Sequence, residues 1–171
     1  KGKPRQYGKK RNRKIRIDRP VAREQLPPAK DGDLVGAAWY GRYPNPDTDE
    51  AILALLEDRS PEFAIRMTLL VEQLKAQGAW VTVTSGYRYR ERGFLMWGAF
   101  VLSRAKNKKQ VQARLDDIDE VAKEHGLDVN IQWRHPEGYK ATREAATRLA
   151  EAYEVVYATR HGALNSDHYD A

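Results

Sequence analysis

The chain has 171 residues, 41% of them hydrophobic, and a formal net charge of +6, which suits one folded domain with its own core. It contains no cysteine, so a disulfide framework and a thiolate zinc site are both excluded, and any metal must use His, Asp or Glu. No apolar run reaches the roughly 18 residues that a membrane-spanning helix needs.

The positive charge is concentrated in residues 1–19, KGKPRQYGKKRNRKIRIDR. They hold ten Lys or Arg against one Asp, a net charge of +9, and since the whole chain carries +6 the other 152 residues carry −3. Such a stretch is typical of an extended arm that a polyanion or an acidic protein surface orders. Nucleic acid and a large assembly partner are the candidates, and a solvated or targeting tail is the alternative. The candidate binding residues are Lys9, Lys10, Arg11, Arg13, Lys14 and Arg16.

Residues 20–46 hold five prolines, which predicts an extended strap. The aromatic residues Trp39, Tyr40 and Tyr43 are expected to pack on the parent domain, with a carbohydrate or partner contact as the alternative. The predicted organisation is therefore a basic arm and proline-rich strap over residues 1–46, followed by a domain over 47–171.

The domain opens with two predicted helices and a strand. Asp47 and Glu50 are spaced as a capping box for a helix through residues 52–56. Ser60 and Pro61 open a second helix that ends at Gly78. Residues 79–85, AWVTVTS, have the composition of a short central strand. The apolar stripe of the second helix is Phe63, Met67, Leu70, Val71 and Leu74.

The second half of the domain mixes both kinds of element. Residues 93–105 predict a buried helical segment, and Asn107 with Gln110 caps the next helix, which ends at Gly126. A helix is also expected over 137–153, and strands over 129–133 and 154–159. The predicted fold class is α+β, a small and mainly antiparallel sheet packed with helices.

Two motifs leave the predicted strands, TSGYR at 84–88 and HGALNSDHY at 161–169. Residues at strand ends project from the edge of a sheet, so both motifs are placed to line one cleft. Arg88 offers a guanidinium that can grip a carboxylate or stabilise charge developing during peptide hydrolysis. His168 offers an imidazole suited to zinc.

Residues 79–171, with a strand ending in SGYR and a later SDHYDA, resemble the zinc peptidases of the D-alanyl-D-alanine carboxypeptidase (VanY-like) superfamily. The resemblance implies hydrolysis of peptidoglycan stem peptides by a zinc-activated water, in a phage lytic or virion-associated enzyme located at the virion or the bacterial cell wall or periplasm. It implies that His168 is a zinc ligand and that Ser85 and Arg88 lie at the substrate. Ser166 and His168 match the S-x-H of the family pattern.

The family pattern continues beyond the sequence given. Ala171 stands where the family has glycine, and its aspartate ligand, general-base glutamate and third ligand lie further on, so the chain is expected to be an incomplete copy of the site. A substitute site from His161, His168 and Asp167 or Asp170, with His135 also in reach, is the alternative for metal binding. The alternative functions are a catalytically inactive assembly module and a nucleic-acid-binding protein built on the basic arm.

Overall fold

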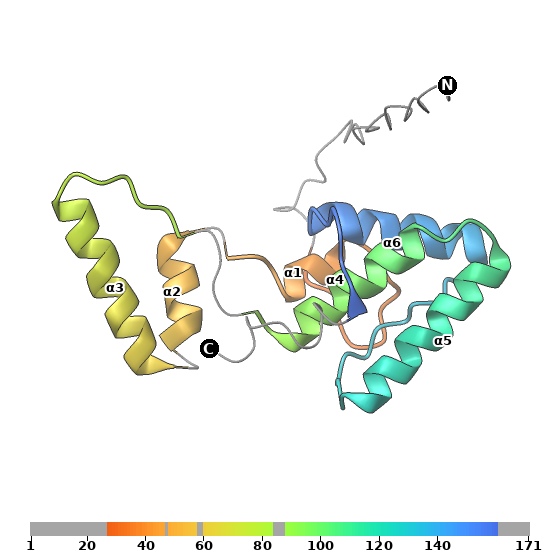
Figure 1. Cartoon of the computed structure of the whole chain (residues 1–171). Helices are drawn as coiled ribbons and strands as arrows, with labels where there is room; N and C mark the ends of the chain where they lie inside the picture. Colours follow the sequence, from red (N-terminus) through yellow and green to blue (C-terminus); the bar gives the residue numbers. More distant parts are fainter. Residues whose placement is uncertain (1–26, 47, 58–59, 84–87, 161–171) are drawn as a thin grey trace, which may run out of the picture.

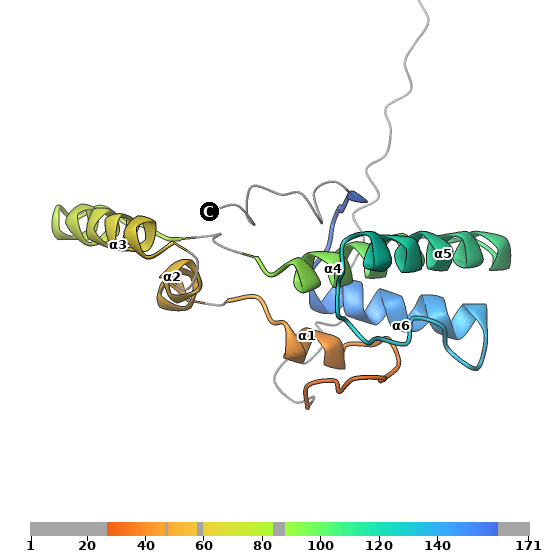
Figure 2. The ribbon, with the colours of Figure 1, turned by 90° about the horizontal axis from the view of Figure 1, so that it is seen from below.

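The computed structural model describes residues 27–46, 48–57, 60–83 and 88–160. Helices α1, α4, α5 and α6 lie together, and α2 and α3 form a separate antiparallel hairpin (Figure 1). Seen from below, α4 and α5 lie in one layer above α1 and α6 (Figure 2). No helix within the described ranges is long and apolar enough to cross a membrane. The helices are α1 (Ala38–Arg42), α2 (Asp49–Glu57), α3 (Pro61–Ala76), α4 (Arg90–Ser103), α5 (Lys108–Glu124) and α6 (Tyr139–Ala152).

The prediction of an α+β fold with an antiparallel sheet is wrong for the part of the chain that the structure describes. Residues 79–83, 129–133 and 154–159 form no strand there, and the one β-type contact is an isolated parallel bridge between Leu34 and Gln132. The backbone amide of Gln132 donates to the carbonyl of Asp33, and the carbonyl of Gln132 accepts from the amide of Val35, each at 2.9 Å. Composition shows that side chains suit a pleated surface, but a strand also needs a neighbouring backbone along its length, and within the described residues these segments have one only at Gln132.

The predicted buried helix over 93–105 is confirmed as part of α4. Eight of its residues are buried, and a helix that is apolar on most sides belongs inside a protein. Small residues allow its neighbours to approach closely. At Gly98, a β-carbon would lie 2.6 Å from the Cη2 atom of Trp133, so the indole ring packs directly on the backbone of α4.

Helices α5 and α6 cover α4 with one apolar face each. The predicted cap of α5 is confirmed, because the side-chain oxygen of Asn107 accepts from the amide of Gln110 at 2.9 Å. The inward face of α6 consists mostly of alanines around the fully buried Leu149. The short alanine side chains bring α6 close to α4 and lose no side-chain entropy on burial. The buried residues of α5 are Val111, Leu115, Ile118 and Val121.

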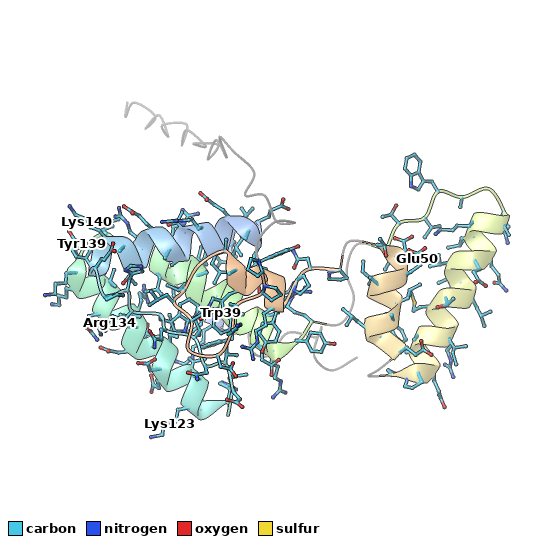
Figure 3. All side chains as sticks on the ribbon, turned by 180° about the vertical axis from the view of Figure 1, so that it is seen from behind. Trp39, Glu50, Lys123, Arg134, Tyr139 and Lys140 are labelled. Atoms are coloured by element: carbon cyan, nitrogen blue, oxygen red, sulfur yellow. The ribbon has the colours of Figure 1, made fainter. Side chains whose placement is uncertain are left out.

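The strap packs on the helices, as predicted for its aromatic residues. Trp39 is fully buried between the helices (Figure 3), and its indole nitrogen donates to the carbonyl of Leu34 at 3.2 Å. Tyr40 is also buried and meets the ring of Tyr153 edge to face, with ring centroids 5.2 Å apart. The second half of the strap therefore contributes to the main core.

The α2–α3 hairpin has a small core of its own. Leu56 and Ala64 are buried against each other, with Leu53 and Leu55 beside them. Thr48 caps α2 by accepting from the amide of Ala51, and the proposed capping residue Asp47 lies outside the described residues. Of the apolar stripe predicted for α3, only Val71 is buried. Phe63, Leu70 and Leu74 are between 37% and 47% exposed, because α2 covers only one side of α3.

Candidate functional site

Most of the predicted site residues lie outside the described part of the chain. This holds for Ser85 and His168, for Ser166 and His161, and for the whole basic arm over residues 1–19. Arg88 is described, two residues before the start of α4. The expected meeting of Arg88 with His168 across one cleft therefore stays a prediction.

The Arg88 side chain is half-buried beside the first turn of α4. Its Nε atom is shielded from solvent and has no hydrogen-bond partner within the described ranges. A buried guanidinium nitrogen without an acceptor is costly. A carboxylate or an amide oxygen placed here would gain a charge-assisted hydrogen bond. Arg88 thus retains one donor that no acceptor in the described ranges satisfies.

Arg92, in the first turn of α4, faces inward and anchors the strap. It is 8% exposed, and its Nη1 atom donates to the carbonyl of Pro44 at 3.5 Å. Nearby, the hydroxyl of Tyr153 donates to the carbonyl of Tyr43 at 3.0 Å. Burial raises the pKa of Tyr153, and the positive charge of Arg92 partly opposes that rise. The phenol is therefore neutral across the physiological range, and this cluster fixes the start of α4 in place.

The two described histidines serve local structure. His125 is the residue at the carboxyl end of α5. The Nδ1 atom of His135 accepts from the amide of Glu137 at 3.3 Å, and the His135 amide donates to the hydroxyl of Thr142 at 2.9 Å. These bonds form the turn that leads into α6. Within the described ranges, no three His, Asp or Glu side chains are grouped closely enough to hold a metal ion.

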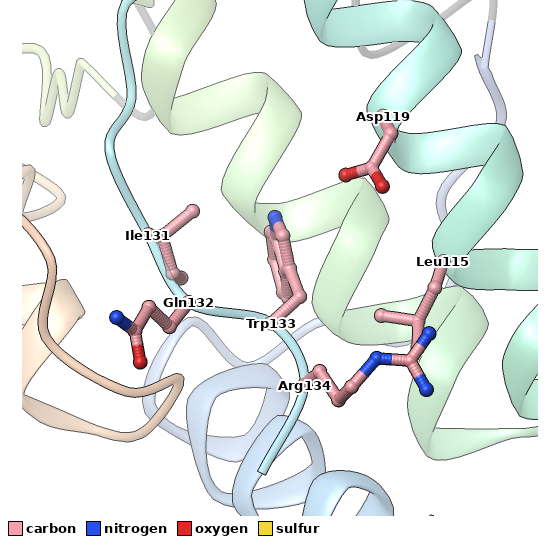
Figure 4. Close-up of a pocket in the computed structure, with 6 residues that line it drawn as sticks. All are labelled: Leu115, Asp119, Ile131, Gln132, Trp133 and Arg134. Atoms are coloured by element: carbon pink, nitrogen blue, oxygen red, sulfur yellow. The ribbon is translucent and has the colours of Figure 1, made fainter. Parts of the chain in front are cut away.

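A pocket that the sequence did not suggest lies between α5 and residues 131–134 (Figure 4). Its volume is about 260 Å³, slightly below the range of about 300–1,000 Å³ for small-molecule sites. Leu115, Ile131 and Trp133 supply apolar surface, while Asp119 and Arg134 supply one charge of each sign. Arg134 is already engaged, since its Nη2 atom donates to the side-chain oxygen of Gln112 at 2.6 Å.

The sequence does not indicate this pocket, because its lining comes from two segments that meet only in the folded chain. Asp119 lies on the polar side of an amphipathic helix, where a carboxylate is ordinary. Arg134 follows a segment that the sequence predicts to be a strand. Neither residue belongs to a motif, so no local signal marks the pair.

Comparison with models of protein families, with curated proteins and with solved structures finds no match to this chain. The functional assignment rests on the residues themselves.

Proposed function

We propose that the chain belongs to a zinc-dependent peptidase that hydrolyses peptidoglycan stem peptides. The support is the pair of motifs, SGYR at 85–88 and SDHYDA at 166–171, together with the state of the Arg88 side chain. Within the described ranges the Nε atom of Arg88 has no hydrogen-bond partner, and a guanidinium is suited to bind the oxygen of a peptide substrate.

In this proposal Arg88 binds the substrate's terminal carboxylate or its scissile carbonyl. A guanidinium presents a planar fork of donors, so it can hold a carboxylate through two parallel hydrogen bonds. If it faces the carbonyl, the same donors stabilise the negative charge that develops on the oxygen during hydrolysis. Ser85 is the second proposed substrate contact.

Zinc would supply the Lewis acid that activates water for amide hydrolysis. A catalytic zinc needs about three protein ligands, and the residues described do not group three. His168 is the one ligand that the family pattern assigns within the sequence given. Metal binding is therefore the first property to be measured.

The proposal is tested by metal content and by a matched pair of arginine variants. We expect the folded chain to take up zinc, and His168→Ala to abolish the uptake. Arg88→Lys keeps the charge and loses the fork, and should lower kcat/KM on a stem peptide by about 10²-fold. Arg90→Lys is the control, since Arg90 is exposed and lies two residues after Arg88, at the start of α4. Absence of zinc from the folded protein, or equal rates for both arginine variants, would contradict the proposal.

A second candidate function is a catalytically inactive assembly module whose basic arm binds nucleic acid or a large partner. The charge separation favours it, because residues 1–19 carry +9 and the remainder −3. Binding through phosphate contacts would weaken steeply with salt. We expect binding to DNA of arbitrary sequence that falls between 50 and 200 mM salt, concentrations at which counterion release is pronounced, and that is lost on deletion of residues 1–19. Binding that survives this deletion would count against the arm.

A further inference from the structure

The pocket between α5 and residues 131–134 contains a buried hydrogen-bond donor that no described residue satisfies. Trp133 is 5% exposed, and its indole nitrogen makes no hydrogen bond to another residue of the described ranges. Figure 4 shows this nitrogen on the side of the ring that lies toward the Asp119 carboxylate. A buried donor without an acceptor is costly, so an oxygen atom of a ligand in this pocket would gain a hydrogen bond.

The Trp133 ring is fixed, and its nitrogen therefore keeps one direction. The ring meets that of Phe94 edge to face, with ring centroids 5.9 Å apart, and its far end packs on the backbone of α4 at Gly98. A donor that is already held in place loses little conformational entropy when a ligand binds. The indole nitrogen is thus a preorganised contact.

Two opposite charges lie on the wall of the same pocket. Asp119 is exposed and forms no hydrogen bond or ion pair with another described residue. Arg134 uses its Nη2 atom to bind Gln112, and a guanidinium has further donors that stay available. Within the described ranges Asp119 and Arg134 do not pair with each other. The pocket therefore offers separate contacts to a cationic and to an anionic group.

The separation of these contacts suits a ligand in which the two charges lie close together. Gln112, which holds Arg134, lies two turns before Asp119 on α5, about 10.5 Å along the helix axis. An α-amino acid places its nitrogen about 3 Å from its carboxylate oxygens. With a hydrogen bond of about 2.9 Å at each end, it spans about 9 Å. The pocket volume of about 260 Å³ also limits the ligand to a small molecule.

We propose that this pocket binds a free α-amino acid with an aliphatic side chain. The ammonium group donates to Asp119, and the carboxylate accepts from the Trp133 indole nitrogen and from Arg134. The aliphatic side chain lies against Leu115 and Ile131, which supply the apolar part of the wall. The inference uses no residue of the proposed peptidase site and does not depend on that function.

Binding is expected to be weak, because both charged side chains are exposed and water screens such contacts. The expected dissociation constant for L-leucine is on the order of 1 mM. A nitrogen-15 correlation spectrum of the full chain measures it, since each of the four tryptophans gives one indole signal. The Trp133 signal is the one that is lost in Trp133→Phe. L-leucine, added to about 20 mM to bracket the expected constant, should move this signal along a saturating curve. The signal of Trp80, which is 96% exposed, should stay in place.

Two derivatives of leucine and a matched pair of variants test the two charge contacts. Leucinamide lacks the carboxylate and N-acetyl-leucine lacks the ammonium group, so each should bind about 5-fold more weakly than leucine. Asp119→Asn should weaken leucine binding by a similar factor. Glu120→Gln is the control, because Glu120 is the next residue of α5, is exposed, and does not line the pocket; its binding should be unchanged.

The same spectra contain the results that would overturn the proposal. A Trp133 signal that stays in place at the highest leucine concentration would do so. Equal binding of leucine and its two derivatives would also do so, as would equal effects of the Asp119 and Glu120 variants. The remaining signals of each spectrum show whether a variant keeps its fold.

Discussion

Replacing Gly98 by alanine probes the contact that sets residues 129–133 against α4. The new β-carbon would lie 2.6 Å from Cη2, 2.7 Å from Cζ2 and 3.3 Å from Cζ3 of Trp133, whereas carbon atoms pack best at about 3.5–4.0 Å. The indole ring is 5% exposed and meets the ring of Phe94 edge to face, so it has little room to move. The substitution must therefore shift either the ring or the helix.

The magnitude follows from two opposing effects. Overpacking a core costs about 1–3 kcal/mol, and replacing a glycine inside a helix by alanine returns about 1 kcal/mol. We expect the free energy of unfolding to fall by about 1 kcal/mol and by no more than about 2 kcal/mol. Urea denaturation measures this change, provided that the m-value is the same for both proteins.

A control separates the indole contact from other effects of the substitution. In a Trp133→Leu background the clash is absent, so Gly98→Ala should be neutral or stabilising there, and the double-mutant cycle gives the coupling directly. If Gly98→Ala in the otherwise wild-type chain instead raises the free energy of unfolding by about 1 kcal/mol, as helix propensity alone would do, the reasoning is refuted. This result would mean that the indole ring of Trp133 does not pack on the backbone of α4.

Two further predictions concern the ends of helices. Asn107→Ala removes the acceptor of the Gln110 amide at the start of α5 and should lower the free energy of unfolding by about 1 kcal/mol, while Asn107→Asp should largely preserve it. At the start of α2, the hydrogen bond from the Val83 amide, and then that from Lys75, lowers the pKa of Asp49. A lowered pKa means that this stabilisation is present above about pH 4 and is lost as the pH falls through the folded value. Hydrogen exchange of the hairpin should increase in that range, and Asp49→Asn should remove this pH dependence; an unchanged profile would refute the role of Asp49.

The helices could be predicted because their signals are local. Pro61 at the start of α3 and Asn107 before α5 act on backbone groups within one turn, and the stripe of α5 recurs at the helical period. Short-range geometry determines these features, and the sequence contains all of it.

The candidate site was less accessible to prediction. Arg88 was singled out through its motif, but nothing in the motif indicates that its Nε atom is shielded from solvent. The pocket beside Asp119 and Arg134 depends on how residues 131–134 lie against α5. Such a juxtaposition comes from packing between distant segments, and a single sequence gives no measure of which segments meet.

The sequence by itself determined the chemistry and the elements: the basic arm, the absence of thiol ligands, and helices that follow from their caps and periodicity. Within the described residues, only the tertiary structure decided that Val83, Gln132 and Val156 stand outside any strand and that Phe63, Leu70 and Leu74 of α3 are exposed. The physical reason is that a helix satisfies its backbone hydrogen bonds within its own segment. A strand and an apolar face both need a partner from elsewhere, and the fold determines whether that partner is present.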